Sequence, residues 1–147
     1  MIWYGRGRCA MSALHANTGD RQAIGSAAIF SKLPPDALET LLAQSRLQVL
    51  PRGTLLFEQD ERATVFYLLL EGWVKLFRMS AGGDETVVGL FTRGDCIADV
   101  PCLMEAAYPV SGRTVSDARL LAIPSRAIVE MTRANPAACL GMLASMS

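Results

Sequence analysis

Residues 94–115, with the sequence GDCIADVPCLMEAAYPVSGRTV, contain the side chains best placed to bind a ligand. Their pattern predicts a strand, a tight turn, a short helix, a loop and a second strand. Such a segment could hold a small anion at the beginning of its helix. Asp99 and Arg113 are its charged candidates for contacts to a polar ligand. The chemistry expected of this segment is therefore ligand binding.

Catalytic and metal-binding sets cannot be assembled from the rest of the sequence. His15 is the single histidine, which excludes a Ser-His-Asp or Cys-His set. A jelly-roll metal centre of the cupin type would need two or three histidines and a carboxylate. The cysteines at 9, 96, 102 and 139 form no CxxC pair and have no histidine at metal-ligand spacing. We therefore expect no enzyme activity and no metal, and we interpret the cysteines as reduced, mostly buried thiols.

The composition is that of one globular domain. The chain has 147 residues, of which 51% are hydrophobic, and this is enough for a real core. Its 14 basic residues balance 14 acidic ones, so there is no overall basic footprint for nucleic-acid binding. No run approaches the roughly 18 apolar residues of a membrane span, and the N-terminus lacks the apolar stretch of a signal peptide. We expect a cytoplasmic protein with no membrane partner.

The middle of the chain has the pattern of a β-sandwich or jelly roll. Short apolar segments alternate with turn signals about every 10 residues, and Gly53, Gly72 and Gly94 fall in those turns. A helix is predicted before them at 29–45, with Pro34-Pro35 at its start. Strands are expected at 47–50, 54–59, 64–72, 73–79 and 85–91.

The two ends of the chain depart from this pattern. Residues 1–27 are rich in small residues and are interpreted as a flexible extension; the alternative is a strand or helix that docks on the domain or on a second subunit. A strand at 118–124 precedes a helix at 126–134, for which Ser125 is the expected N-cap. Another helix is expected from Pro136, and its apolar stripe is still running at the last residue. That stripe consists of Leu140, Leu143 and Ala144.

Four segments occur in the order and spacing of a known family. They are PRGTLLFEQD (51–60), YLLLEGWVKLF (67–77), GDCIAD (94–99) and SDARLLAIPSRAIVEM (116–131). Together they resemble the effector domain of the Crp/Fnr superfamily, the cyclic-nucleotide-binding fold of bacterial transcription regulators, over about residues 28–147. The resemblance implies a mainly β fold with flanking helices, namely a double-stranded β-helix (jelly roll) of the cyclic-nucleotide-binding domain type.

The same resemblance implies a domain organisation. Residues 28–134 would form the β-roll, and residues 135–147 would begin the helix through which family members form homodimers, with Leu140, Leu143 and Ala144 on its apolar stripe. The helix-turn-helix domain that reads DNA in the family has no counterpart in these residues. The chain would therefore be the sensing half of a transcription regulator, and DNA binding would belong to the full-length protein.

The family's ligand-binding residues are only partly retained. Family members bind the cyclic-nucleotide phosphate with an arginine, a serine and helix N–H groups, while a glutamate contacts the ribose. The match of GDCIAD to the family pattern places Ala98 at its glycine and Asp99 at this glutamate, one methylene shorter. Asp99 could equally be a turn or helix-capping acid. Ile97, Ala98 and Asp99 are the first candidate pocket residues.

The phosphate-binding pair is replaced. Counting back from the last strand places Tyr108 and Pro109 at the family's Arg-Ser pair, and counting forward from the acidic residue shifts the match by one. Neither count gives a guanidinium, and Pro109 has no N–H to donate. Arg113 could substitute from the next strand or could be a surface residue. Tyr108, Pro109 and Arg113 complete the candidate pocket, and we predict that cyclic AMP is not its ligand.

These replacements leave the signal and any cofactor unknown. They resemble the nitric-oxide-responsive Dnr-like branch of the family more than the cyclic-AMP receptors. An iron–sulfur cluster is not expected, because Cys9 is the single N-terminal cysteine. Haem stays an option, although His15 lies outside the predicted roll.

Two hypotheses remain for the function. The chain is a sensory domain for a signal other than cyclic AMP, or it is a ligand-free dimerisation module with a decayed pocket. A sensor should keep a cavity with polar groups near Asp99 and Arg113. A ligand-free module should fill that space with Leu90, Ile97, Leu103 and Tyr108.

Overall fold

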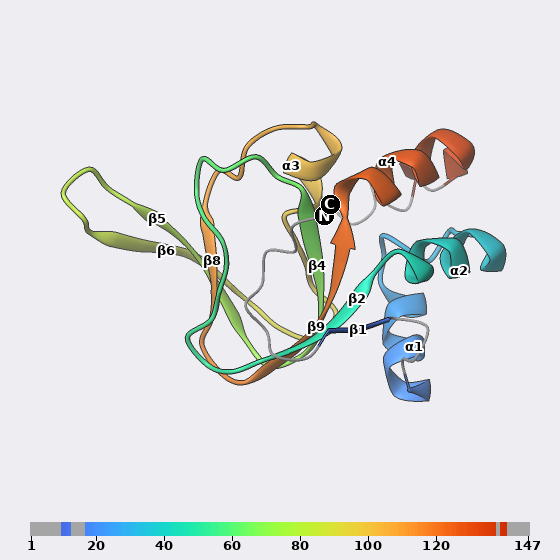
Figure 1. The fold of residues 1–147 in the computed structure, drawn as a ribbon, viewed down its shortest axis with the longest axis horizontal. Helices are drawn as coiled ribbons and strands as arrows, with labels where there is room; N and C mark the ends of the chain where they lie inside the picture. Colours follow the sequence, from blue (N-terminus) through green and yellow to red (C-terminus); the bar gives the residue numbers. More distant parts are fainter. Residues whose placement is uncertain (1–9, 13–16, 138, 141–147) are drawn as a thin grey trace.

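The computed structural model describes residues 10–12, 17–137 and 139–140. Its elements are β1 (Ala10–Ser12), α1 (Thr18–Ser26), α2 (Pro35–Ala43), β2 (Arg46–Leu50), β3 (Leu55–Phe57), β4 (Val65–Glu71), β5 (Val74–Met79), β6 (Glu85–Phe91), β7 (Cys96–Ile97), α3 (Asp99–Leu103), β8 (Ser111–Thr114), β9 (Ala118–Pro124) and α4 (Ser125–Ala134). The strands form two antiparallel sheets, ordered β1-β2-β9-β4-β7 and β3-β8-β5-β6, with α1, α2 and α4 gathered at one side (Figure 1). The predicted mainly β fold is confirmed.

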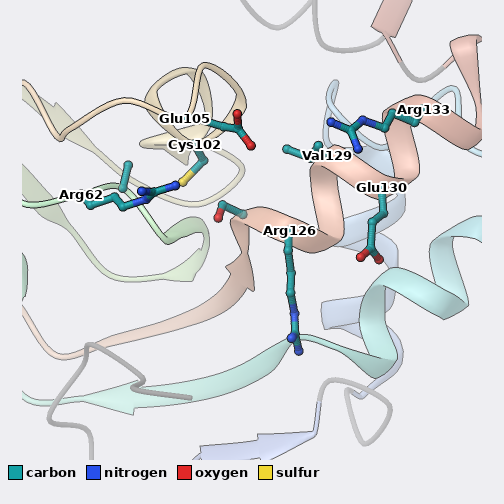
Figure 2. Close-up of a pocket in the computed structure, with 9 residues that line it drawn as sticks. Arg62, Cys102, Glu105, Arg126, Val129, Glu130 and Arg133 are labelled. Atoms are coloured by element: carbon teal, nitrogen blue, oxygen red, sulfur yellow. The ribbon is translucent and has the colours of Figure 1, made fainter.

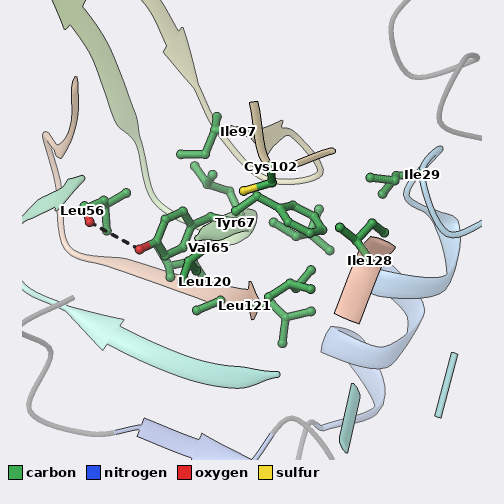
Figure 3. Packing of buried hydrophobic residues seen from close by; sticks show 14 of the residues in the cluster. Ile29, Leu56, Val65, Tyr67, Ile97, Cys102, Leu120, Leu121 and Ile128 are labelled. Atoms are coloured by element: carbon green, nitrogen blue, oxygen red, sulfur yellow. Dashed lines mark hydrogen bonds between the residues drawn. The ribbon is translucent and has the colours of Figure 1, made fainter. Parts of the chain in front are cut away.

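Strands β4 and β9 form the centre of the core. Residues 65–70 and 120–124 are all buried, and the two strands pair with Leu68 opposite Leu121. Strand β4 is apolar on both faces because it packs against the second sheet on one side and near the helices on the other (Figure 3). The run VFYLLL, which was predicted to be part of a strand, is therefore a buried strand at the centre of the roll.

The described part of residues 1–27, namely residues 10–12 and 17–27, is ordered on the domain and differs from the predicted flexible extension. Strand β1 pairs with β2, and α1 packs on the domain with Ile24 fully buried. The side chain of Asn17 caps α1 by accepting a 2.7 Å hydrogen bond from the N–H of Asp20. Asp20 is 3% exposed, and it accepts a 3.1 Å hydrogen bond from Arg119 of β9. This ion pair holds α1 on the sheet, as the alternative of a docked element supposed.

Helix α4 begins one residue earlier than expected. Ser125, the predicted N-cap, is its first helical residue, and Pro124 occupies the N-cap position without a side-chain cap. The reason is a tertiary contact, because the N–H of Ser125 donates a 2.8 Å hydrogen bond to the carbonyl of Thr64. This bond joins the beginning of α4 to the residue before β4.

The helix predicted to start at Pro136 is only partly described. Residues 136, 137, 139 and 140 are helical, and Leu140 is 64% exposed. Leu143 and Ala144, the other two members of the predicted apolar stripe, lie outside the described residues.

Strands β5 and β6 form a hairpin that projects from the body of the molecule (Figure 1). β6 is the edge strand of its sheet, and the side chains of Val87, Val88 and Leu90 are more than half exposed. Leu90 therefore does not fill the interior, as the hypothesis of a ligand-free module had supposed. It lies opposite Lys75 of β5, and no further strand pairs with the other edge of β6.

Candidate ligand site

The turn into α3 retains the backbone shape of a glycine turn. Ile97 of β7 lies opposite Tyr67 of β4 and is 2% exposed. Ala98 then directs the chain into α3 with a φ of 67°, in the left-handed region. This conformation costs a residue with a Cβ about 1 kcal/mol or more relative to glycine. The candidate site therefore contains a strained alanine directly before its helix.

Asp99 is the half-buried first residue of α3. Burial and the nearby charge of Asp99 raise the pKa of the Cys102 thiol to about 12. The same two causes, burial first, raise the pKa of Cys96 well above its usual value. Both thiols are thus protonated at neutral pH and have little nucleophilic character. Of the cysteines predicted to be mostly buried thiols, Cys102 is buried, Cys96 is half-buried and Cys139 is exposed, while Cys9 lies outside the described residues.

Tyr108 lies in the interior, at a position where the sequence comparison sought a phosphate-binding arginine. Its side chain is 2% exposed, and its ring stacks on that of Phe57 with centroids 4.4 Å apart. Its hydroxyl donates a hydrogen bond to the carbonyl of Val65 at 2.7 Å. The same oxygen accepts hydrogen bonds from the N–H groups of Val65 at 3.2 Å and Thr64 at 3.3 Å. The phenol therefore connects the loop after α3 to the beginning of β4.

The protonation state of Tyr108 follows from this environment. Burial raises the pKa of its phenol to about 12, although the hydrogen bonds to the backbone of Val65 and Thr64 lower it in part. The side chain is consequently neutral over the physiological range and supplies no charge to an anion.

Arg113 and Pro109 do not join this cluster. Pro109 is exposed. A Cβ added to Gly112 would lie 2.8 Å from the ring of Phe57, so this position of β8 faces the interior. Successive strand residues point to opposite faces, and Arg113 accordingly lies on the outer face, 3.6 Å from Glu85. The structure brings Ile97, Ala98, Asp99 and Tyr108 to the region around α3 but places Arg113 on the other side of the sheet.

Sequence reasoning missed the residues that hold Tyr108. Phe57 is one apolar residue in a short strand, and Thr64 and Val65 contribute only backbone atoms. The hydroxyl contact joins residues that are 43 positions apart, so no local pattern could have indicated it. Leu103, another residue expected near the pocket, is half-buried and packs against the core.

Metal and cofactor options depend on residues outside this cluster. Within the described ranges, no group of three or more His, Cys, Asp or Glu side chains could hold a metal ion. None of the helices in these ranges is long and apolar enough to cross a bilayer. Cys9 and His15, on which the iron–sulfur and haem options depend, lie outside the described residues.

The family of this chain is shown by a sequence match that spans most of the roll. Residues 47–135 match the family model of the cyclic nucleotide-binding domain. The chain belongs to this family. The match runs from β2 to the end of α4 and includes the whole segment around α3, so the predicted fold type is confirmed on sequence as well as on structure.

Three bacterial proteins illustrate the similarity. The cyclic AMP receptor protein of Thermus thermophilus is 30% identical over 95 residues, which are 65% of this chain and 44% of that protein. The sensor domain of the transcriptional regulator DNR from Pseudomonas aeruginosa has a TM-score of 0.79 and 28% identity, over 86% of this chain and 85% of that one. The catabolite activator protein of Thermus thermophilus has a TM-score of 0.69 and 26% identity, over 81% of this chain and 56% of that one.

These comparisons confirm the resemblance to the Crp/Fnr superfamily that four short segments had indicated. The chain contains a cyclic nucleotide-binding domain that is similar to the sensory domains of Crp/Fnr-type regulators. It spans less than half the length of its curated relative from Thermus thermophilus.

Proposed function

We propose that this chain is the sensory domain of a Crp/Fnr-type transcription regulator that responds to a signal other than cyclic AMP. The observation that carries the proposal is the buried phenol of Tyr108 beside the loop after α3. Its hydroxyl is already engaged by the backbone of Thr64 and Val65 and has no hydrogen left for a ligand phosphate.

The electrostatics of the region support the proposal. A cyclic nucleotide brings a negative charge into the roll, and a buried charge needs a partner. Tyr108 is neutral, Pro109 has no N–H to donate, and Arg113 lies on the outer face of β8 beside Glu85. Loss of a buried charge-assisted pair costs on the order of 2–5 kcal/mol. This corresponds to a loss of affinity of about thirtyfold to a few thousandfold.

The burial of Ile97 and Tyr108 favours a second candidate function, a ligand-free dimerisation module. Ile97 and Tyr108 are 2% exposed, and Leu103 packs against the core. A domain whose pocket is filled by its own side chains would transmit no small-molecule signal. Both candidates are binding proteins without catalytic activity, and they differ in whether a small molecule enters the roll.

Native mass spectrometry of the purified chain, together with its absorbance spectrum, separates the two functions. A sensor is expected to carry a reproducible mass increment or to gain thermal stability with members of a metabolite library. A Soret band would identify haem as the cofactor. An unliganded mass, no absorbance beyond the protein band and no stabilising compound would contradict the sensor and support the module.

We also propose that the chain works as a cytoplasmic homodimer and that DNA contact belongs to the full-length regulator. The exposed side chain of Leu140, on the helical residues that follow α4, supports a partner for this segment. Sedimentation equilibrium is expected to give the mass of a dimer. A monomer at all accessible concentrations would contradict this part of the proposal.

A further inference from the structure

Another pocket lies between the loop before β4, helix α3 and the first turns of α4 (Figure 2). Its volume is about 290 Å³, which is enough for a small ligand. It is separate from the side chain of Tyr108, which does not line it. Its lining residues are Arg62, Ala63, Cys102, Glu105, Ser125, Arg126, Val129, Glu130 and Arg133.

Basic side chains dominate the lining of this pocket. Arg62, Arg126 and Arg133 contribute three guanidinium groups against two carboxylates. Among the residues that the structure describes, no ion pair is formed by any of these three arginines. Arg62 and Arg133 approach the pocket from opposite sides, whereas the guanidinium of Arg126 points away from it (Figure 2). Two unpaired cations therefore flank the space.

The N-terminal end of α4 adds hydrogen-bond donors and a partial positive charge beside the arginines. α4 has ten residues, and its N-terminal end has no side-chain cap. Ser125, the first residue of this helix, lines the pocket and carries a hydroxyl group that can donate a hydrogen bond. The positive end of the helix dipole thus reinforces the field of Arg62 and Arg133.

We propose that this pocket binds a small dianion, either inorganic phosphate or the phosphoryl group of a small metabolite. Guanidinium groups bind phosphoryl oxygens in a bidentate manner, and two of them on opposite walls match a dianion better than a single carboxylate. The hydroxyl of Ser125 supplies a further donor. Glu105, whose carboxylate points toward the pocket, weakens binding by repulsion and so limits affinity (Figure 2).

Such a ligand would connect the two helices that border the roll. Cys102 and Glu105 belong to α3 and the turn after it, whereas Ser125 and Arg133 belong to α4. A bound dianion would therefore restrain α3 relative to α4 without entering the interior. This site goes beyond the proposed sensory function, because it does not use the space around Tyr108.

A calorimetric titration of the chain with inorganic phosphate at constant ionic strength tests the site. Binding with a dissociation constant of about 1 mM or tighter is expected. Loss of one guanidinium contact in Arg62→Gln or Arg133→Gln is expected to weaken binding about tenfold. Glu105→Gln is expected to strengthen it. Circular dichroism of each variant checks that the fold is intact.

The control is Arg78→Gln, an exposed arginine of β5 far from the pocket lining, which should leave the affinity unchanged. Glycerol phosphate in place of inorganic phosphate separates a metabolite phosphoryl group from the free ion, and acetate tests the preference for a dianion. Absence of saturable phosphate binding, equal binding of acetate, or an equal loss in Arg78→Gln would overturn the proposal.

Discussion

Tyr108 is the residue that decides how the region after α3 is built. Its ring stacks on Phe57 of one sheet, while its hydroxyl bonds to the backbone at the start of β4 in the other. One side chain thus connects the two sheets and the loop after α3.

Tyr108→Phe removes only the hydroxyl and should therefore separate bonding from packing. We expect a loss of about 1–3 kcal/mol in the free energy of unfolding, because the carbonyl and N–H of Val65 are left buried without their partner. Urea denaturation measures this loss. Ser31→Ala, which removes an exposed hydroxyl bond to Ala28, serves as the control and should change stability by less than about 0.5 kcal/mol.

The raised pKa of Tyr108 makes stability depend on alkaline pH. Its pKa is about 12 in the folded chain and about 10 in the unfolded chain. Because folding favours the neutral phenol, its contribution to stability is fully present below the pKa of the unfolded chain. This contribution is lost as the pH rises through the pKa of the folded chain. Stability should therefore fall between about pH 10 and 12. In Tyr108→Phe, the free energy of unfolding should fall less steeply with pH over this range. If urea denaturation gives the same fall with pH for the variant and the wild type, the raised pKa of Tyr108 is not its cause.

Replacement of Ala98 by glycine should stabilise the folded chain, because glycine adopts a positive φ without strain. With φ at 67°, the alanine is strained, and Ala98→Gly is expected to raise the free energy of unfolding by about 1 kcal/mol. Thermal and urea denaturation measure the gain. Ala37→Gly within α2 is the matched control, and the same substitution there should cost about 1 kcal/mol. A loss of stability in Ala98→Gly would show that the left-handed turn is not strained.

At the scale of elements, α1 is held on the sheet by a pair that no local pattern reveals. Asp20 is nearly fully buried, while Arg119 is one-third exposed, and hydrogen bonding to Asp20 raises the pKa of the guanidinium. The two residues are 99 positions apart in the sequence. The small, polar residues around α1 therefore suggested a flexible segment, although a tertiary ion pair orders it.

Asp20→Asn should release α1 without disturbing the roll. We expect a loss of about 1–2 kcal/mol, less than for a fully buried pair because water screens Arg119. Hydrogen exchange should accelerate in residues 18–26 and stay unchanged in β4. Glu39→Gln, which breaks the exposed pair with Arg21, should have almost no effect on stability. Equal exchange in α1 of wild type and Asp20→Asn would contradict this account.

Sequence patterns predicted the roll better than its surfaces. The apolar run of β4 and the glycine-marked turns were sufficient for a β-sandwich or jelly roll, because burial and turn geometry are local properties. The choice of the jelly roll came from the family resemblance. The face occupied by Arg113 was not predictable, since it depends on the register of β8 with its neighbours and on an irregularity between Leu55 and Phe57. The exposure of Leu90 depends on β6 being an edge strand, which hydrophobicity alone does not reveal.

At the scale of the whole molecule, the chain has the fold of a cyclic nucleotide-binding domain, and no arginine or lysine is buried among the residues that the structure describes. The roll, the short helix α3 and the preceding turn are all present. Our central proposal, that this domain responds to a signal other than cyclic AMP, rests on the neutral phenol of Tyr108 in that interior.

Isothermal titration of the purified chain with cyclic AMP is the most direct test of this account. We predict no saturable heat at ligand concentrations up to about 1 mM, since no cation of the described interior faces the phosphate. The cyclic AMP receptor protein of Thermus thermophilus, titrated in the same buffer, is the reference. A dissociation constant in the micromolar range for this chain would contradict the central claim.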